Sequence, residues 1–294
     1  MRIDLHVHSD ASDGTDAPGD LVRKAWALRS DGFDRLDGIA LTDHDTIAGH
    51  AAAATAIADI AGDAERPFVV VPGVEISCIS HGVTLHLLGY LFDSAEPQLA
   101  AELDLLRTDR VRRAQAMVDK LAELGAPITW AQVRAIAGDG AIGRPHVARA
   151  LVAAGVVADV PAAFVPEWIG DGGRGYVEKY SLDPAQAIAL VKSAGGVTVF
   201  AHPAASSRGA ILDEAAIAEL ASAGLDGLEV DHPDHDEATR KRLRILAGEL
   251  GLLVTGSSDY HGSVKDTPLG ANTTDPEVFD ALRERATGAQ VFSR

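Results

Sequence analysis

Seven short apolar runs alternate with longer segments of helical character, and this alternation is the feature that most limits the possible folds. The apolar runs have the length and composition of buried strands, and the segments between them have the spacing of helices. Strand and helix in regular succession predict an α/β protein with a mainly parallel sheet, either open or closed into a barrel. The expected strands are 3–5, 38–41, 68–74, 84–91, 197–201, 227–230 and 252–258, and the expected helices are 18–29, 46–61, 184–194, 213–223 and 236–250.

The alternation stops between residues 96 and 183, where the pattern is helical and predicts no strand. A long helical segment at 98–124 ends at Gly125, and a glycine-rich loop follows at 169–176. We interpret this region as a helical cap that is inserted into the barrel and lies over the site. The predicted organisation is therefore a first part of the barrel at 1–95, the cap at 96–183, and a second part of the barrel at 184–294.

The cysteine content and the charge restrict where this chain works and what it binds. Cys78 is the one cysteine among 294 residues, so no disulfide can form within the chain, which suits a reducing compartment. The sequence shows neither a signal peptide nor a transmembrane stretch, so we expect a cytoplasmic protein without a membrane partner. The net charge of -17 repels long duplex nucleic acid, although metals and arginines can create a local site for a small anion.

Side chains that commonly bind metals follow the predicted strands. His6 and His8 are two residues apart in an extended segment, so both imidazoles point to the same side and can reach one ion. Asp13 lies on the turn that follows and adds a carboxylate. The carboxyl ends of the strands in a (β/α) barrel converge on one face, so residues far apart in sequence meet there. The further candidates are His44 after 38–41, Glu75 after 68–74, His86 within 84–91, His202 after 197–201, and Asp259 and His261 after 252–258.

Six histidines and three carboxylates are more ligands than a single ion needs. A catalytic zinc takes about three protein ligands, so this set suits two or three ions that share a carboxylate. Imidazoles and carboxylates without a thiolate favour divalent Mn, Fe or Zn. Clustered divalent ions are typical of phosphoryl hydrolysis, and we expect a hydroxide that bridges two metals to attack the phosphorus in line.

The segments that carry these residues resemble, in order, the motifs of the PHP (polymerase and histidinol phosphatase) family. They read DLHVHSDASDG, ALTDHDT, GVEIS, LHLLGY, AHP and SSDYHG. The resemblance covers 1–95 and 184–294, and it implies a distorted seven-stranded (β/α) barrel with a trinuclear metal site. Carried over residue by residue, it implies three ligand sets: His6, His8, Glu75 and Asp259; Glu75, His86 and His202; and Asp13, His44 and His261.

The insertion resembles that of the stand-alone PHP phosphoesterases of the ribonuclease AM type, which carry an arginine and a histidine near the start of a helix. Here these are Arg144 and His146, flanking Pro145, which suits a first helical position; a helix N-terminus also binds anions. Those relatives hydrolyse the 3′-phosphate of nucleoside 3′,5′-bisphosphates, and some trim short RNA from its 5′ end. The resemblance implies that Arg144 and His146 hold the 5′-phosphate, and an ion pair of Arg144 with a nearby aspartate is the alternative.

Weaker patterns identify further candidates. Asp43 or Asp4 is expected to orient a metal-bound imidazole. His235 either contacts the metal or substrate or supports the start of the helix that follows it. Arg208 and Lys265 lie on loops after strand ends, where they can contact phosphate or remain solvated charges. The sequence does not indicate which residue is the general acid.

These patterns favour a metal-dependent phosphoesterase that removes the 3′-phosphate of nucleoside 3′,5′-bisphosphates, with 5′–3′ exoribonuclease activity on short RNA as an extension. A histidinol-phosphate phosphatase would use the same barrel and the same chemistry. A metal-binding module of a polymerase assembly, without enzymatic activity, is the third reading. The cap with Arg144 and His146 favours the first function, and the complete ligand set disfavours the third.

Overall fold

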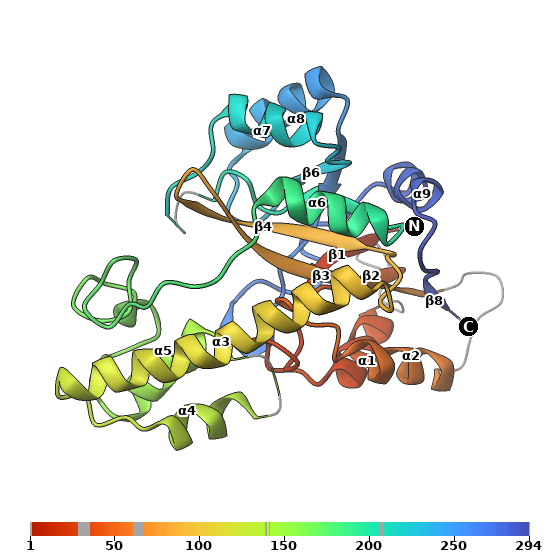
Figure 1. The fold of residues 1–294 in the computed structure, drawn as a ribbon. Helices are drawn as coiled ribbons and strands as arrows, with labels where there is room; N and C mark the ends of the chain where they lie inside the picture. The colour runs from red at the N-terminus through yellow and green to blue at the C-terminus, as the bar shows by residue number, and fades with distance from the viewer. Residues whose placement is uncertain are drawn as a thin grey trace.

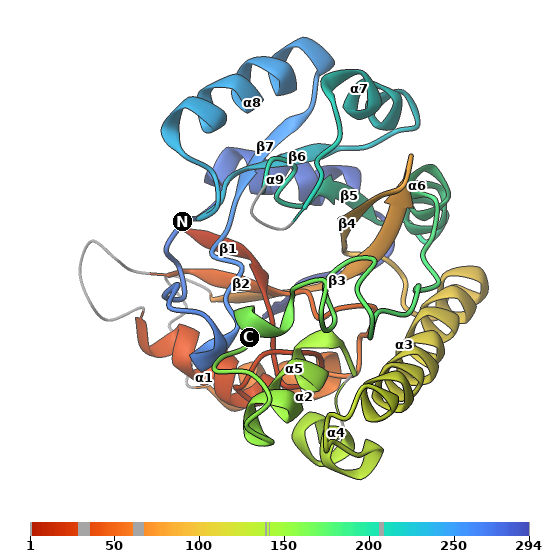
Figure 2. The ribbon, with the colours of Figure 1, turned by 90° about the vertical axis from the view of Figure 1, so that its left-hand side faces the viewer.

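The computed structural model describes residues 2–28, 36–60, 68–138, 140, 142–205 and 209–293. Seven strands follow one another in the sheet in their sequence order, and the sheet curls into a nearly closed barrel (Figures 1 and 2), which confirms the predicted fold class. At the seam, Val7 and Tyr260 form an isolated bridge. The strands are β1 (Ile3–Val7), β2 (Gly38–Leu41), β3 (Val69–Ser80), β4 (Val83–Tyr90), β5 (Val197–Phe200), β6 (Gly227–Asp231) and β7 (Leu253–Gly256), and the short β8 (Phe292–Ser293) pairs with β3.

One strand of the barrel runs against its neighbours. β4 pairs antiparallel with both β3 and β5, whereas the other neighbouring pairs among β1 to β7 are parallel. The turn between β3 and β4 is the pair His81-Gly82, with φ of 50° and 77°, as a type I′ hairpin turn requires. β3 continues to Ser80, past the predicted end at residue 74, because its second half pairs with β4. Glu75 and His86 therefore lie within the hairpin and not at strand ends.

Helices surround the barrel on its outer side (Figure 2). Aspartates at the N-cap positions explain where several of them begin, because each carboxylate accepts a hydrogen bond from a backbone N–H of the first turn. The helices are α1 (Pro18–Ala27), α2 (His50–Asp59), α6 (Pro184–Ser193, capped by Asp183), α7 (Glu214–Ser222, capped by Asp213), α8 (Glu237–Leu250, capped by Asp236) and α9 (Pro276–Arg285, capped by Asp275). α9 is not among the helices that the sequence predicts.

Helix α2 starts later than the sequence predicts, at His50 instead of residue 46. The carboxylate of Asp45 does not cap it. Asp45 accepts hydrogen bonds from Ser77 N (2.7 Å), Ser77 Oγ (2.9 Å) and the Arg110 guanidinium. Asp45 thus links the loop after β2 to the hairpin and to the inserted helices.

The inserted segment is helical, as predicted, and projects from one end of the sheet (Figure 1). Its first helix, α3 (Pro97–Glu123), contributes to two hydrophobic clusters. The early leucines of α3 pack against the barrel core, and the later residues of α3 pack within the insertion. Met117, Val133, Val147 and Leu151 are among the buried residues of the second cluster. The proposed boundaries at 96 and 183 stay a prediction. The helices of the insertion are α3 (Pro97–Glu123), α4 (Trp130–Ala137) and α5 (Arg144–Ala153), followed by a single 3-10 turn at Pro161–Ala163.

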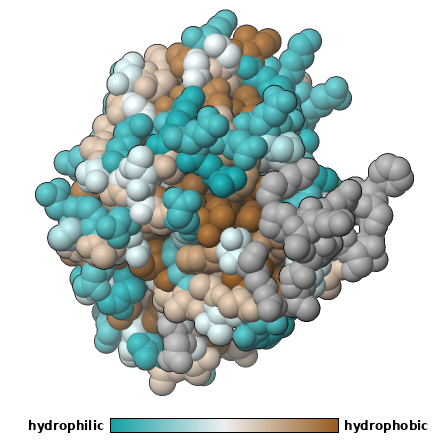
Figure 3. Space-filling view, turned by 90° about the vertical axis from the view of Figure 1, so that its right-hand side faces the viewer, coloured by the Kyte–Doolittle hydropathy of each residue, from teal (hydrophilic) through white to brown (hydrophobic). Residues whose placement is uncertain are grey.

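The face of the molecule that is turned away from the insertion is mostly hydrophilic, with hydrophobic side chains near its centre (Figure 3). This distribution is ordinary for a folded domain, whose surface always retains much apolar area. Among the helices in the described residues, none combines the length and the apolar composition needed to cross a membrane.

Candidate metal centre and substrate cavity

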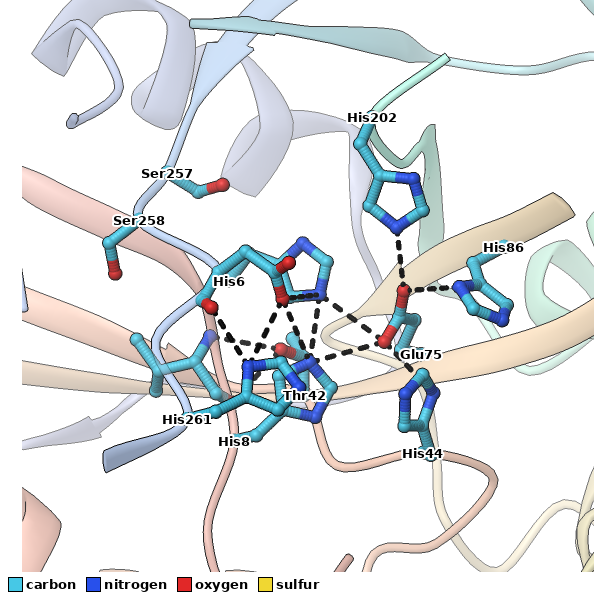
Figure 4. Close-up of polar contacts among 12 residues, drawn as sticks. His6, His8, Thr42, His44, Glu75, His86, His202, Ser257, Ser258 and His261 are labelled. Atoms are coloured by element: carbon cyan, nitrogen blue, oxygen red, sulfur yellow. Dashed lines mark hydrogen bonds and ion pairs between the residues drawn. The ribbon is translucent and has the colours of Figure 1, made fainter. Parts of the chain in front are cut away.

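Glu75 lies at the centre of a cluster of imidazoles at one end of the barrel (Figure 4). Its side chain is buried, and both carboxylate oxygens face histidines that come from different strands and loops. Oε1 is 2.8 Å from His86 Nδ1 and 3.1 Å from His202 Nε2; Oε2 is 2.9 Å from His44 Nδ1, 3.1 Å from His8 Nε2 and 3.3 Å from His6 Nε2.

Two aspartates extend this cluster toward the β1–α1 loop and the end of β7. Asp13 Oδ1 is 3.4 Å from His261 Nε2, and Asp259 Oδ1 is 3.4 Å from His8 Nε2. The structure thus brings all nine predicted metal ligands together. Three groups have ligand atoms within 4.8 Å of one another: His8, Asp13, His44 and His261; His6, His8 and Asp259; and His44, Glu75 and His86. His44 is thus shared between two groups and His8 between two, a sharing that the resemblance did not imply.

Three polar atoms of the cluster lack a hydrogen-bond partner within the described part of the chain. His44 Nδ1, Glu75 Oε2 and His86 Nδ1 are buried and lie close together, yet none of them has a hydrogen bond. Leaving such an atom unsatisfied costs about 1–3 kcal/mol. Convergent imidazole nitrogens and carboxylate oxygens are the donors that divalent cations bind. The residues therefore fit a divalent metal centre.

The charge states of Glu75, Asp13 and His44 also suit metal binding. Burial opposes the ionisation of Glu75, but the imidazoles of His44 and His86 outweigh it and hold the pKa of Glu75 well below its usual value. Burial likewise opposes the ionisation of Asp13, and His261 and His44 keep its pKa well below the usual range. Burial lowers the pKa of His44 to about 4. At neutral pH these groups are carboxylates and a neutral imidazole, which are the forms that bind metals.

Glu229 of β6 supports the cluster from behind, and the sequence analysis did not identify it. Its Oε1 is 3.1 Å from His6 Nδ1, and its Oε2 accepts a hydrogen bond from the backbone N–H of His202 at 2.7 Å. The Ser257 hydroxyl also donates to it. Burial opposes ionisation, but His6 outweighs it and lowers the pKa of Glu229. A carboxylate on the second nitrogen of an imidazole fixes the ring and increases its basicity. The sequence signal that could have identified Glu229 is its charge inside the otherwise apolar run GLEV.

Replacing Glu229 by glutamine should lower metal affinity and kcat/KM by about 10- to 100-fold, because His6 loses the carboxylate that orients it. Metal titration and steady-state kinetics would measure the two effects. The matched control is Glu249→Gln on the exposed side of α8. Unchanged metal affinity in Glu229→Gln would contradict the assigned role.

Neither Asp43 nor Asp4 contacts an imidazole directly, and the expected role of one of them in orienting an imidazole stays a prediction. The carboxylate of Asp43 accepts hydrogen bonds from Ser9 N (2.8 Å), Ser9 Oγ (2.7 Å) and Ser12 Oγ (2.6 Å). Ser12 Oγ lies 3.4 Å from His8 Nδ1, so Asp43 acts on an imidazole through this serine. The carboxylate of Asp4 holds the Ser258 backbone and hydroxyl instead.

The ring of His235 is held by backbone groups, and its expected contact with the metal or substrate stays a prediction. Its Nδ1 donates to Val230 O at 2.9 Å, and its Nε2 accepts from Ala204 N at 3.2 Å. Both ring nitrogens are therefore occupied by the backbone, and Asp236 caps α8. His232 lies nearer to the centre, with its Nε2 3.4 Å from Asp259 Oδ2.

A cavity of about 790 Å³ lies between the metal cluster and the inserted helices. Predicted metal ligands line one side, and apolar, polar and charged side chains line the rest, with the carboxylates of Asp45, Asp171 and Asp234 among them. Phe164, Tyr180, Ile211 and Val264 are exposed hydrophobic residues that line it. The predicted ligands in the lining are Asp13, His44, His86, His202, Asp259 and His261, and the cations are Arg110, Arg113, Arg144, Lys179 and Lys265.

The predicted substrate residues take different places around this cavity. Arg144 lines it, and its Nη1 donates to Asp171 Oδ1 at 2.5 Å, which is the ion pair that the sequence left open as the alternative. His146 is buried, and its Nδ1 accepts a hydrogen bond from Gly143 N at 3.0 Å. Its ring therefore caps the N-terminus of α5. His146 is not part of the cavity lining, whereas its neighbour Pro145 is.

Two further substrate candidates lie on loops after the strands. Lys265 lines the cavity with its Nζ 2.6 Å from Asp259 Oδ2, so it pairs with a predicted metal ligand. Arg208 lies outside the described residues. Arg110 and Lys179 also line the cavity, and the sequence analysis missed both. Arg110 follows a threonine and an aspartate in the charged run RTDRVRR, which the sequence analysis assigned only to the helical segment 98–124.

Comparison with known proteins shows similarity over most of the chain. The chain is 32% identical over 271 residues to a 5′–3′ exoribonuclease of Haemophilus influenzae, covering 92% of this chain and 94% of that protein. It is 34% identical over 261 residues to a 3′,5′-nucleoside bisphosphate phosphatase of Chromobacterium violaceum, covering 88% and 87%. A crystal structure from Bifidobacterium adolescentis, assigned as a metal-dependent phosphoesterase, matches with a TM-score of 0.87 and 36% identity, covering 97% and 96%. No protein-family model matches the chain.

The barrel, the buried cluster of histidines and carboxylates, and these similarities define a metal-dependent phosphoesterase. The chain belongs to the PHP family of these enzymes, as its motifs indicated. It is similar to both nucleoside bisphosphate phosphatases and 5′–3′ exoribonucleases within that family. This membership sets aside the reading of a non-enzymatic polymerase module.

Proposed function

We propose that this enzyme removes the 3′-phosphate from nucleoside 3′,5′-bisphosphates and also trims short RNA that carries a 5′-phosphate. The observation that carries the proposal is the single cavity that joins a metal cluster to a group of cationic side chains. Such a cavity offers two places for anions, one at the reacting phosphate and one at a second phosphate. The activities of the relatives in Haemophilus influenzae and Chromobacterium violaceum support the same substrate class.

The nine clustered side chains would hold two or three divalent ions of Mn, Fe or Zn. When bound, such ions generate hydroxide at neutral pH and neutralise charge on the phosphate. Glu75 contacts imidazoles with both of its carboxylate oxygens, so it would be the carboxylate that the ions share. Glu229 and Ser12 hold the rings of His6 and His8 from behind. Asp13 and Asp259 close the cluster on the side of the cavity.

The cationic side of the cavity would bind the second phosphate. Arg110, Arg113, Arg144 and Lys179 lie together in a protein whose net charge is -17, so this positive group is a local exception. Guanidinium groups form forked, charge-assisted hydrogen bonds to phosphate oxygens. The exposed hydrophobic residues of the same cavity, Phe164 among them, would contact the base and the sugar. A cytoplasmic location and the exclusion of long duplex nucleic acid stay predictions.

Phosphate release from three substrates by the Mn-loaded protein tests the proposed function. The substrates are adenosine 3′,5′-bisphosphate, a 5′-phosphorylated RNA trimer and histidinol phosphate. We expect the highest kcat/KM for the bisphosphate or the trimer, because each carries a second phosphate for the cationic side of the cavity. A preference for histidinol phosphate would retain the barrel and its metal chemistry but reject our account of the cap.

Replacing Arg144 by alanine should raise the KM for adenosine 3′,5′-bisphosphate about tenfold, the effect of losing one hydrogen bond to a charged group. The KM for a generic aryl phosphate, which has no second phosphate, should stay the same. Arg107→Ala, at an exposed arginine of α3 that pairs with Asp104, is the matched control. Equal changes in KM for both substrates would show that Arg144 does not select the second phosphate.

A further inference from the structure

We propose that Lys179, together with Arg144, selects substrates with a second phosphate, by binding that phosphate on the cap side of the cavity. This inference rests on the proposed function and assigns part of its selectivity to a residue without a recognised motif. Lys179 lies in the last part of the insertion, between the 3-10 turn and α6, and it lines the same cavity as the predicted metal ligands His86 and Asp259.

Lys179 belongs to a strap, residues 176–180, that returns from the insertion along helix α3. Hydrogen bonds to α3 hold this strap on both sides of Lys179, so its backbone is positioned before substrate binds. A side chain on a fixed backbone loses less conformational freedom when it binds a ligand. The hydrogen bonds join Lys120 Nζ to Tyr176 O (2.8 Å), Arg113 Nε to Val177 O (2.6 Å), Tyr180 N to Asp109 Oδ2 (2.7 Å) and Tyr180 OH to Glu102 Oε1 (2.6 Å).

The other cations of the cavity already have partners within the protein. Arg110 donates to Asp45 and Ser77, Arg144 donates to Asp171, and Lys265 pairs with Asp259. Arg113 donates to a backbone carbonyl. Lys179, by contrast, makes neither a hydrogen bond nor an ion pair with any residue in the described part of the chain. Its ammonium group is therefore available to a ligand without breaking an existing contact.

The electrostatic surroundings of Lys179 favour an incoming anion. Burial and the guanidinium of Arg110 lower the pKa of Lys179 to about 8, against the attraction of Asp45, and Arg113 and Arg144 add to the lowering. Asp45 is already bonded to Arg110, so it does not neutralise the lysine. A phosphate dianion would relieve the repulsion among these cations and form charge-assisted hydrogen bonds with them.

Kinetics of Lys179→Met with two substrates test this inference on the Mn-loaded enzyme. One substrate is adenosine 3′,5′-bisphosphate, and the other is adenosine 3′-phosphate, which lacks the second phosphate. We expect kcat/KM for the bisphosphate to fall about 10- to 100-fold, mainly through KM, since a hydrogen bond to a charged group is lost. The value for adenosine 3′-phosphate should not change. Calorimetry should show a matching loss of affinity for adenosine 5′-phosphate.

Two further variants separate selection from structure. Lys179→Arg keeps the positive charge and should retain most of the preference for the bisphosphate. Lys241→Met removes an exposed lysine of α8, away from the cavity lining, and should behave like the wild type. Equal losses on both substrates, or no loss on either, would overturn the inference while leaving the proposed function intact. A wild-type enzyme that does not prefer the bisphosphate would overturn both.

The pH dependence provides a second readout. The ratio of the two kcat/KM values should fall as the pH rises through about 8, because the free enzyme then loses the ammonium charge of Lys179. The neighbouring arginines on α3 and α5 stay charged over this range, and a phosphate monoester is fully ionised above about pH 7. Taking the ratio cancels any titration at the metal centre. The ratio should be flat in Lys179→Met, and a slope that persists in this variant would overturn the assignment.

Discussion

Replacing Glu75 by glutamine should lower the metal-dependent phosphatase activity by at least about a thousandfold. The charge that divalent ions neutralise in phosphoryl transfer corresponds to several kcal/mol, and each 1.4 kcal/mol changes the rate about tenfold. Glu75 faces five imidazoles, so the substitution removes the carboxylate that lies between all five of them. Glutamine keeps the shape of the side chain, and its amide nitrogen cannot bind a metal.

The metal content of the purified variant, measured together with its kinetics, checks the cause of this loss. We expect fewer bound ions in Glu75→Gln and an unchanged circular dichroism spectrum. The matched control is His81→Ala, at an exposed histidine in the turn that follows the same strand. A folded Glu75→Gln protein with full metal content and full activity would refute the shared-ligand role.

Replacing Arg110 by methionine should lower the free energy of unfolding by about 3 kcal/mol, the lower end of the range for breaking a buried ion pair. Asp45 is buried and Arg110 is largely buried, so the substitution leaves an uncompensated carboxylate between the β2–α2 loop and α3. Burial opposes ionisation of Asp45, but Arg110 outweighs it and lowers the pKa of Asp45. The contribution of this ion pair to the free energy of unfolding is therefore present above the ordinary pKa of an aspartate. It is lost as the pH falls through the lowered pKa of Asp45.

Urea unfolding of the single and double variants measures the coupling in this pair. The double variant Arg110→Met with Asp45→Asn should lose less stability than the sum of the two single variants, because no unpaired charge remains. Arg107→Met provides the control, since Arg107 pairs with Asp104 on the exposed surface of the same helix. Additive losses in the double variant would show that the two side chains are not coupled.

Local patterns in the sequence were sufficient for most of the fold and for the composition of the site. The runs IDL, GIAL and VTVF lie in strands of the barrel because buried parallel strands require continuous apolar residues. His6 and His8 appear together because an extended chain places alternate residues on the same side. His202 and Asp259 reach the same cluster because parallel strands of one barrel end on the same face. That these residues bind ions stays a proposal.

The sequence did not reveal how β4 and the hairpin are arranged. A β/α pattern predicts parallel neighbours, but β3 and β4 are joined by the two-residue turn His81-Gly82, which only an antiparallel pair can use. Glu75 and His86 therefore come together through the hairpin and not at two strand ends. The sequence correctly predicted that Glu75 and His86 lie in the cluster, and the antiparallel pairing of β3 with β4 decided how they come together.

The partners of individual polar atoms were decided by the tertiary structure alone. The sequence analysis expected Asp43 or Asp4 to orient an imidazole, yet Glu229 from β6 contacts His6 because the nearly closed barrel brings β6 close to β1. His235 was a candidate for contact with the metal or substrate, but its ring nitrogens bond to the backbone of β6 and of the loop after β5. Lys179 had no pattern at all, and it gains its place because the strap folds back along α3. Residue types and periodicity determine which elements form and which chemistry is present, whereas the pairing of a given nitrogen or oxygen depends on distances that exist only after the loops have packed.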